Sequence, residues 1–181
     1  MITYAEALAM LLREAEPIHE TETIPLMYST GRVLAEDVTS MIDVPGWDNS
    51  QMDGYCLRAA DLASASENAP VRLPVAERIA AGKVGVALEP GTCARIFTGA
   101  PMPEGADTVV PQEEVERDGD MAVFRTAPKK GAWVRRQGSD VAAGSVILKK
   151  GVRMNRKGYK EIYSRVGRKF IPIQVVNSED V

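Results

Sequence analysis

The residues best suited to chemistry in this chain lie in segment 44–55, which is rich in polar side chains. Asp48 and Asp53 supply two carboxylates, and Ser50 between them supplies a hydroxyl. Gly54 follows Asp53 directly and allows the backbone to bend or a ligand to approach closely. Two carboxylates on a stiff polar loop indicate a site for a hard cation or a polar ligand. A surface loop capped by its own side chains uses the same residue types and is the alternative.

A second polar loop, residues 95–107, begins with an expected strand. Thr98 offers a hydroxyl where that strand ends, and Gly99 with the small residues after it leaves backbone N–H groups accessible. Such groups suit the oxygens of a phosphate, a pterin or another oxyanion. A purely structural turn is the alternative interpretation of this loop.

A third loop, residues 135–140, adds positive charge. Arg135 and Arg136 can hold an anion through paired N–H groups, and Asp140 can face a cation or a polar group. The alternative is a charged turn in which arginine and aspartate compensate each other.

If the three loops converge, they form one site with oxygen ligands for Mg²⁺ and arginines for anionic groups. Asp53, Thr98 and Asp140 are the most informative positions of that site. Covalent catalysis by a nucleophile is not expected, because Ser50 has no base near it in the sequence and His19 is the one histidine.

Composition and charge narrow the function classes. Cys56 and Cys93 are isolated, so we expect small buried thiols in a reducing compartment rather than a zinc site. The sequence shows neither a membrane span nor a signal pattern, so we expect a cytoplasmic protein. Residues 1–124 hold 8 basic and 21 acidic side chains, whereas residues 125–169 hold 14 basic and 2 acidic ones. The basic stretch indicates a surface for an anionic ligand, pairing within the fold, or a solvated face. Nucleic acid is not the favoured partner, because the stretch has no basic-aromatic stacking pattern.

Local patterns predict the elements that must position these loops. Thr3 and Glu6 form a capping-box pair, and apolar residues follow at helical spacing, which predicts an N-terminal helix. A second helix is predicted around residues 159–166. Brief apolar pieces between Gly, Pro and Asp clusters predict a β-rich module. The expected extended segments are residues 23–28, 71–75, 94–97, 108–110, 121–124, 132–134 and 145–148.

Two further features of the strand pattern carry specific predictions. Residues 118–120, Asp-Gly-Asp, lie between two extended pieces and predict a hairpin turn. The apolar run 170–176 predicts a last strand, of the kind that often begins a sheet whose remainder is missing.

The ordered motifs together resemble the molybdopterin molybdenumtransferase family, which comprises bacterial MoeA and the E domain of gephyrin. The resemblance covers residues 1 to about 155, and four segments carry it: residues 31–37, 44–55, 95–101 and 135–140. It implies an α+β, β-rich fold like the MoeA N-terminal region, with short coiled β-sheets, an elongated arm and an N-terminal helix. The implied organisation is an N-terminal helix (1–22), an arm (23–43 and 141–176) and a β-rich substrate-wall domain (44–140). The central α/β domain of the family is expected to be absent.

The resemblance also implies an activity, in which molybdate is inserted into adenylylated molybdopterin with release of AMP and the assistance of Mg²⁺. In the family the site lies between two subunits of a homodimer. The motif positions imply that Asp53 and Asp140 are catalytic and hold the metal. The implied substrate-binding residues are Ser50, Thr98, Gly99, Arg135 and Arg136. Ser139 departs from the family, which usually has Glu there.

Because the central domain is expected to be absent, we expect this chain to be inactive alone. A non-enzymatic module for ligand binding or dimerisation is the alternative function.

Overall fold

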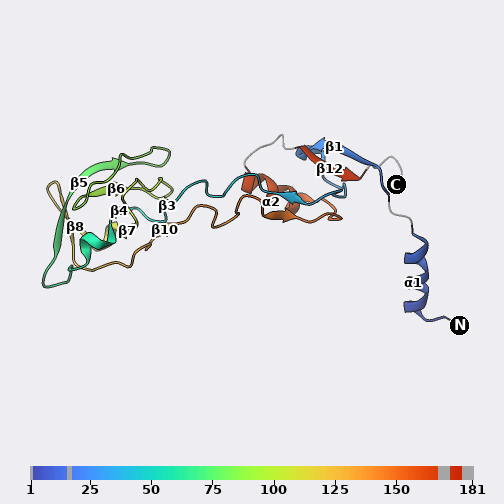
Figure 1. Cartoon of the computed structure of the whole chain (residues 1–181), viewed down its shortest axis with the longest axis horizontal. Helices are drawn as coiled ribbons and strands as arrows, with labels where there is room; N and C mark the ends of the chain where they lie inside the picture. Colours follow the sequence, from blue (N-terminus) through green and yellow to red (C-terminus); the bar gives the residue numbers. More distant parts are fainter. Residues whose placement is uncertain (1, 16–17, 167–171, 177–181) are drawn as a thin grey trace. The chain divides into compact units, whose positions relative to one another are not determined.

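The computed structural model describes residues 2–15, 18–166 and 172–176. The chain divides into two compact units, Met1–Ser40 with Ser145–Val181, and Met41–Gly144. The first unit therefore combines both ends of the chain, and the second is one continuous segment (Figure 1).

The N-terminal helix α1 spans Tyr4–Glu14, as its capping box predicts. The Thr3 N–H donates to Glu6 Oε2 at 2.7 Å, and the Glu6 N–H donates to Thr3 Oγ1 at 3.3 Å. These two bonds satisfy donors that the first helical turn leaves unpaired. No residue of α1 is buried, so its apolar side chains are exposed to solvent in this structure.

The rest of the first unit is built from paired strand segments and the second helix. Strand β1, Thr21–Pro25, pairs antiparallel with β12, Pro172–Val176. The predicted last strand therefore pairs with β1 in a two-stranded sheet, and residues 170–171 of the predicted run lie outside the described residues. Strand β2, Val38–Thr39, pairs with β11, Val146–Leu148, and the predicted second helix is α2, Arg156–Val166.

A small core holds this unit together. Leu26 lies in a 3₁₀ turn, Leu26–Tyr28, which ends the strand predicted for residues 23–28 after Pro25. The turn closes because the Ser29 hydroxyl donates to the Leu26 carbonyl at 2.7 Å. The buried members of the core are Leu26, Leu34, Met154, Ile162, Ile173 and Val175.

The second unit contains a six-stranded sheet in the order β7-β4-β6-β5-β9-β8. The pairs are antiparallel except for β5 with β6, which is parallel. The strands are β4, Gly54–Leu57; β5, Val71–Ile79; β6, Cys93–Ile96; β7, Thr108–Pro111; β8, Val115–Asp118; and β9, Met121–Phe124. Short 3₁₀ turns lie at Ala59–Leu62 and Gln112–Glu114. The predicted hairpin at residues 118–120 is confirmed between β8 and β9, with Gly119 at a φ of 60°.

Two strands of this sheet were not predicted. β4 is buried at all four residues, so it shows no alternation of polar and apolar positions. β8 is mostly polar, and its four residues carry little strand signal. The short pair β3, Asn49–Ser50, with β10, Val134–Arg135, was also not predicted as a pair.

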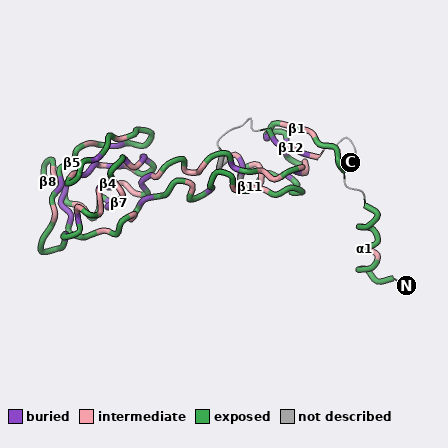
Figure 2. Tube along the Cα trace, in the orientation of Figure 1, coloured by how far each residue is buried: buried purple, intermediate pink, exposed green. Residues whose placement is uncertain are grey.

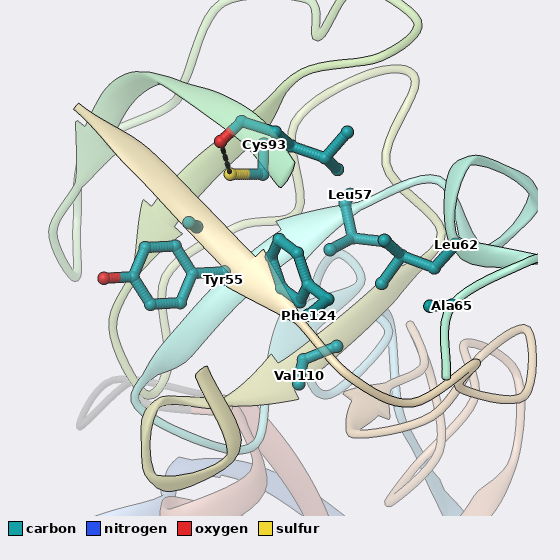
Figure 3. Close-up of a cluster of buried hydrophobic side chains, with 9 residues drawn as sticks. Tyr55, Leu57, Leu62, Ala65, Cys93, Val110 and Phe124 are labelled. Atoms are coloured by element: carbon teal, nitrogen blue, oxygen red, sulfur yellow. Dashed lines mark hydrogen bonds between the residues drawn. The ribbon is translucent and has the colours of Figure 1, made fainter. Parts of the chain in front are cut away.

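Apolar side chains on the sheet form the main core of the second unit. Tyr55 and Phe124 meet edge to face with ring centroids 6.2 Å apart (Figure 3). Buried positions concentrate on the strands, while the connecting loops are largely exposed (Figure 2). Cys56 and Cys93 are buried free thiols, as predicted. Burial raises the pKa of each thiol to about 12, which keeps both protonated and unreactive near neutral pH.

Within residues 2–15, 18–166 and 172–176, neither helix is long and apolar enough to cross a membrane.

Candidate functional site

Residues from the three polar loops border one open pocket of about 500 Å³ in the second unit. The pocket therefore brings together segments that lie far apart in the sequence. Its lining residues are Asn49, Ser50, Gln51, Thr98, Gly99, Arg135, Ser139 and Asp140.

Ser50 lies at the junction of the first loop with the two others. Its N–H donates to the Ala100 carbonyl at 3.0 Å, and its carbonyl accepts from the Gly99 N–H at 2.8 Å. In the β3–β10 pair, Ser50 is also the register partner of Val134. The Ser50 hydroxyl donates to the Met52 carbonyl at 2.6 Å. Ser50 therefore borders the pocket mainly as a structural connector.

Asp53 meets Thr98 rather than lining the pocket directly. The backbone N–H and the hydroxyl of Thr98 both donate to Asp53 Oδ1, at 2.8 and 2.7 Å. These two bonds, with the charge of Arg95, lower the pKa of Asp53 below its usual value. Asp53 thus orients Thr98, whose side chain borders the pocket.

The lowered pKa of Asp53 leads to a testable pH dependence. A carboxylate with a depressed pKa keeps its contacts above its usual value and loses them as pH falls through the lowered one. We expect the NMR shift of the Thr98 amide to titrate with a midpoint below about 3.9, the ordinary value for aspartate. Thr98→Val, which removes the hydroxyl donor, should move the midpoint upward. A midpoint unchanged by Thr98→Val would contradict the role of that hydroxyl.

Asp140 and Arg135 form an ion pair at the pocket wall. The Asp140 N–H donates to the Val44 carbonyl at 2.9 Å, which fixes the third loop against the first. The Ser139 hydroxyl lies 3.4 Å from Asp140 Oδ1. The pocket wall therefore carries one carboxylate and one guanidinium that largely compensate each other.

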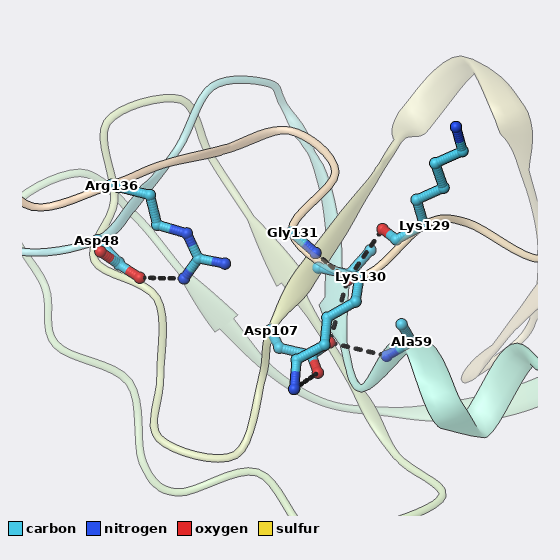
Figure 4. Close-up of polar contacts among 8 residues, drawn as sticks. Asp48, Ala59, Asp107, Lys129, Lys130, Gly131 and Arg136 are labelled. Carbon is cyan, nitrogen blue, oxygen red and sulfur yellow. Dashed lines mark hydrogen bonds and ion pairs between the residues drawn. The ribbon is translucent and has the colours of Figure 1, made fainter. Parts of the chain in front are cut away.

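Arg136 is paired with Asp48 and is not among the residues that line the pocket (Figure 4). The other carboxylate oxygen of Asp48 accepts from the Gln137 N–H at 2.8 Å. Asp43 accepts from Gln137 Nε2 at 2.7 Å and from the Ala143 N–H at 2.8 Å. Asp43 and Asp48 thus form a carboxylate clamp that holds the third loop.

Sequence reasoning did not find the roles of several residues in this region. Asn49 and Gln51 line the pocket, and the Gln51 N–H donates to the Trp133 carbonyl at 2.9 Å. Both flank Ser50 in the first polar loop, and this position next to a predicted site residue could have indicated that they line the pocket. The clamp role of Asp43 had no local signal, because its partners lie about a hundred residues away.

Comparison with known families identifies the architecture. Residues 2–160 match the MoeA N-terminal region (domain I and II). The chain belongs to this family. The β-rich fold expected from the resemblance is likewise confirmed by a solved structure, a molybdopterin biosynthesis moeA protein from Pyrococcus horikoshii OT3. That structure superimposes with a TM-score of 0.87 at 35% identity, over 97% of this chain and 46% of the other.

This chain is also similar in sequence to curated molybdopterin molybdenumtransferases. A molybdopterin molybdenumtransferase of Synechococcus elongatus is 39% identical over 157 residues, which is 85% of this chain and 39% of that protein. A molybdopterin molybdenumtransferase 2 of Mycobacterium tuberculosis is 42% identical over 149 residues, or 82% of this chain and 36% of that protein. The chain thus spans about two fifths of the length of these relatives.

The pocket offers hard oxygen atoms of the kind that would hold a Mg²⁺ ion, but few carboxylates. Asp140 is the one carboxylate among the pocket-lining residues, and it is paired with Arg135. Asp53 uses one oxygen to hold Thr98. In the described part of the chain, no three His, Cys, Asp or Glu side chains cluster as metal ligands. Mg²⁺ often binds one or two protein carboxylates and completes its shell with water and substrate phosphate oxygens, so the residues fit an ion that arrives with its substrate.

Proposed function

We propose that this chain forms the N-terminal wall of a molybdenum-insertion site. The site would transfer molybdate to adenylylated molybdopterin and release AMP. The observation that carries this proposal is that three of the four segments that carry the family resemblance border one pocket. Its mixture of a guanidinium, hydroxyls and amides suits a ligand with several anionic oxygens.

The residues divide into binding and positioning roles. Arg135 would hold an anionic oxygen of the substrate, and Thr98 with the Gly99 backbone would bind further oxygens. Asp140 would hold Mg²⁺ together with substrate oxygens, and the ion would neutralise charge on the departing phosphate. Asp53 would act through Thr98, and Arg136 through its contact with Asp48.

The proposal includes the setting of the site. We propose a cytoplasmic homodimer in which other parts of the enzyme supply the opposite wall. The pocket is open, and the chain matches about two fifths of the length of its relatives, so further substrate contacts would come from elsewhere.

A binding experiment tests the pocket. The tryptophan fluorescence of the 181-residue chain, which comes from Trp47 and Trp133, should change on titration with molybdopterin. Arg135→Gln should weaken binding about tenfold, because it removes a charged hydrogen-bond donor. Arg125→Gln is the matched control, because Arg125 pairs with Glu116 and does not line the pocket. Equal affinity of the Arg135→Gln and Arg125→Gln variants would contradict the assignment.

An activity experiment tests whether this chain supplies only one wall of the site (the half-site). With molybdate, Mg²⁺ and adenylylated molybdopterin, the chain alone should release little AMP. A chimera with residues 2–160 in place of the matching region of the Synechococcus relative should release AMP, and Asp140→Asn should impair it. Robust turnover by the chain alone would refute the half-site. Dimerisation without pterin affinity, measured by light scattering, would favour the non-enzymatic module.

A further inference from the structure

A stack of two arginines around one aromatic ring lies beside Thr98. The guanidinium carbon of Arg78 is 4.6 Å from the centroid of the Phe97 ring, and that of Arg95 is 4.7 Å from the same centroid. Arg95 also lies over Tyr55, at 5.3 Å. The two arginines are register partners in the parallel pair β5–β6. Sheet pairing therefore places two positive charges at one ring.

The two arginines differ in what their N–H groups contact. Arg95 donates to the Gly54 carbonyl at 2.8 Å and to the side-chain oxygen of Gln112. Its charge also acts on Asp53, whose pKa it helps to lower. The donors and charge of Arg95 are therefore engaged within the fold.

Arg78 is an exposed side chain without such compensation. Across residues 2–15, 18–166 and 172–176, no carboxylate forms an ion pair with it, and its guanidinium lies over the Phe97 ring. Exposed arginines on or directly beside the same sheet do have carboxylate partners. Arg72 on the same strand pairs with Asp118, and Arg125 pairs with Glu116. Arg78 thus carries a positive charge without a carboxylate partner, and its guanidinium lies against the Phe97 ring.

Stacking of Arg78 on Phe97 leaves the N–H groups at the edge of the guanidinium available for hydrogen bonds. Contact with an aromatic face restrains the plane of the guanidinium, and its N–H groups point outward in that plane. Two parallel N–H groups match two oxygens of a phosphate.

The stack adjoins the pocket through the backbone. Phe97 directly precedes Thr98, which lines the pocket, and the Phe97 N–H donates to the Ile79 carbonyl at 3.1 Å. Arg78 directly precedes Ile79, so it lies on the chain segment bonded beside the pocket edge. An anion at Arg78 would therefore be a neighbour of a ligand in the pocket.

We infer that Arg78, stacked on Phe97, binds the phosphate group of an anionic ligand at a subsite beside the pocket. The subsite goes beyond the proposed function, which assigns anion binding to Arg135, Thr98 and Gly99. It rests on that function only for the expectation that the phosphate belongs to a nucleotide. Free phosphate presents the same oxygens and is the other source.

NMR titration of the full chain with three probes tests the subsite. AMP and inorganic phosphate should shift the amides of Phe97 and Thr98, whereas adenosine, which lacks the phosphate, should not. Arg78→Gln should weaken AMP binding about tenfold, the usual effect of losing a charged hydrogen bond. Arg78→Lys, which keeps the charge without the planar fork, should restore only part of the affinity. Arg72→Gln on the same strand is the matched control and should leave affinity unchanged.

The outcomes separate the subsite from the proposed function. Tighter binding of AMP than of phosphate would identify a nucleotide, and equal affinities would identify free phosphate as the ligand. Equal loss of affinity in Arg78→Gln and Arg72→Gln, or no amide shift with either phosphate probe, would overturn the subsite. Because the probes contain no pterin, failed molybdopterin binding in the Arg135 experiment would sink the proposed function without affecting this result.

Discussion

Gly54→Ala is expected to destabilise the second unit by roughly 3 kcal/mol, a large part of the stability of a small domain. A Cβ atom at this position would lie 2.2 Å from the Val110 carbonyl oxygen, which is backbone and cannot rotate away. Gly54 is paired on both sides, with Ile96 of β6 and Pro111 of β7, so the strand cannot move outward without breaking the sheet. Thermal unfolding followed by circular dichroism should show a midpoint lowered by roughly 10 °C or more.

Gly46→Ala is the matched control for this prediction. The nearest atom to a Cβ at position 46 is the Asp43 carbonyl oxygen at 4.0 Å, an ordinary contact. Its free energy of unfolding should stay within about 0.5 kcal/mol of the parent. Equal unfolding midpoints for the Gly54 and Gly46 variants would show that β4 and β7 are not as closely apposed as described.

The second large effect is expected from Asp48→Ala, which opens the carboxylate clamp on the third loop. Asp48 accepts from the Gln137 N–H and pairs with Arg136, so its removal leaves both donors without this partner. The loss should be about 1 kcal/mol, because the side chain of Asp48 is 35% exposed and that of Arg136 is 54% exposed, so solvent partly screens the pair. Amides of residues 137–140 should exchange with deuterium several-fold faster. The position of Arg135 and Asp140 should loosen with them.

Acid should mimic this substitution. Partial burial raises the pKa of Asp48, but the bonds from Gln137 and Arg136 outweigh burial and leave the pKa below its usual value. The clamp is therefore complete above the ordinary aspartate pKa of about 3.9 and is lost as pH falls through the lowered value. The pKa of Asp43 is lowered as well, mainly by the Ala143 N–H and then by Gln137, so both carboxylates act in the same direction.

Asp48→Asn separates charge from geometry in the clamp. Its amide oxygen can still accept from the Gln137 N–H, but it carries no negative charge to attract Arg136. Protection of the amides of residues 137–140 from deuterium exchange should therefore lie between that of the parent and that of Asp48→Ala. Protection in this variant should also depend less on pH than in the parent. Unchanged exchange at residues 137–140 in Asp48→Ala would contradict the clamp.

Features that depend on residues close together in the sequence were predicted, whereas features that depend on distant residues were mostly missed. The capping box of α1 and the turn at Gly119 are local, and both were predicted correctly. The β4 strand was missed because burial on both faces removes the alternation that marks a half-buried strand. The partner of β12 was not predicted, because strand pairing across most of the chain leaves no periodic signal in the sequence.

For the candidate site, residue types and spacing alone determined three polar loops with the chemistry of anion and cation binding. Only the tertiary structure decided which charged groups face the pocket. Arg136 and Asp48 are 88 positions apart, and their contact turns two expected ligand groups into a support for the third loop. Arg135, one residue earlier, remains at the pocket wall. The physical reason is that the residue type fixes which groups a charged side chain can bind. Which group it actually contacts depends on how segments that are distant in the sequence pack together.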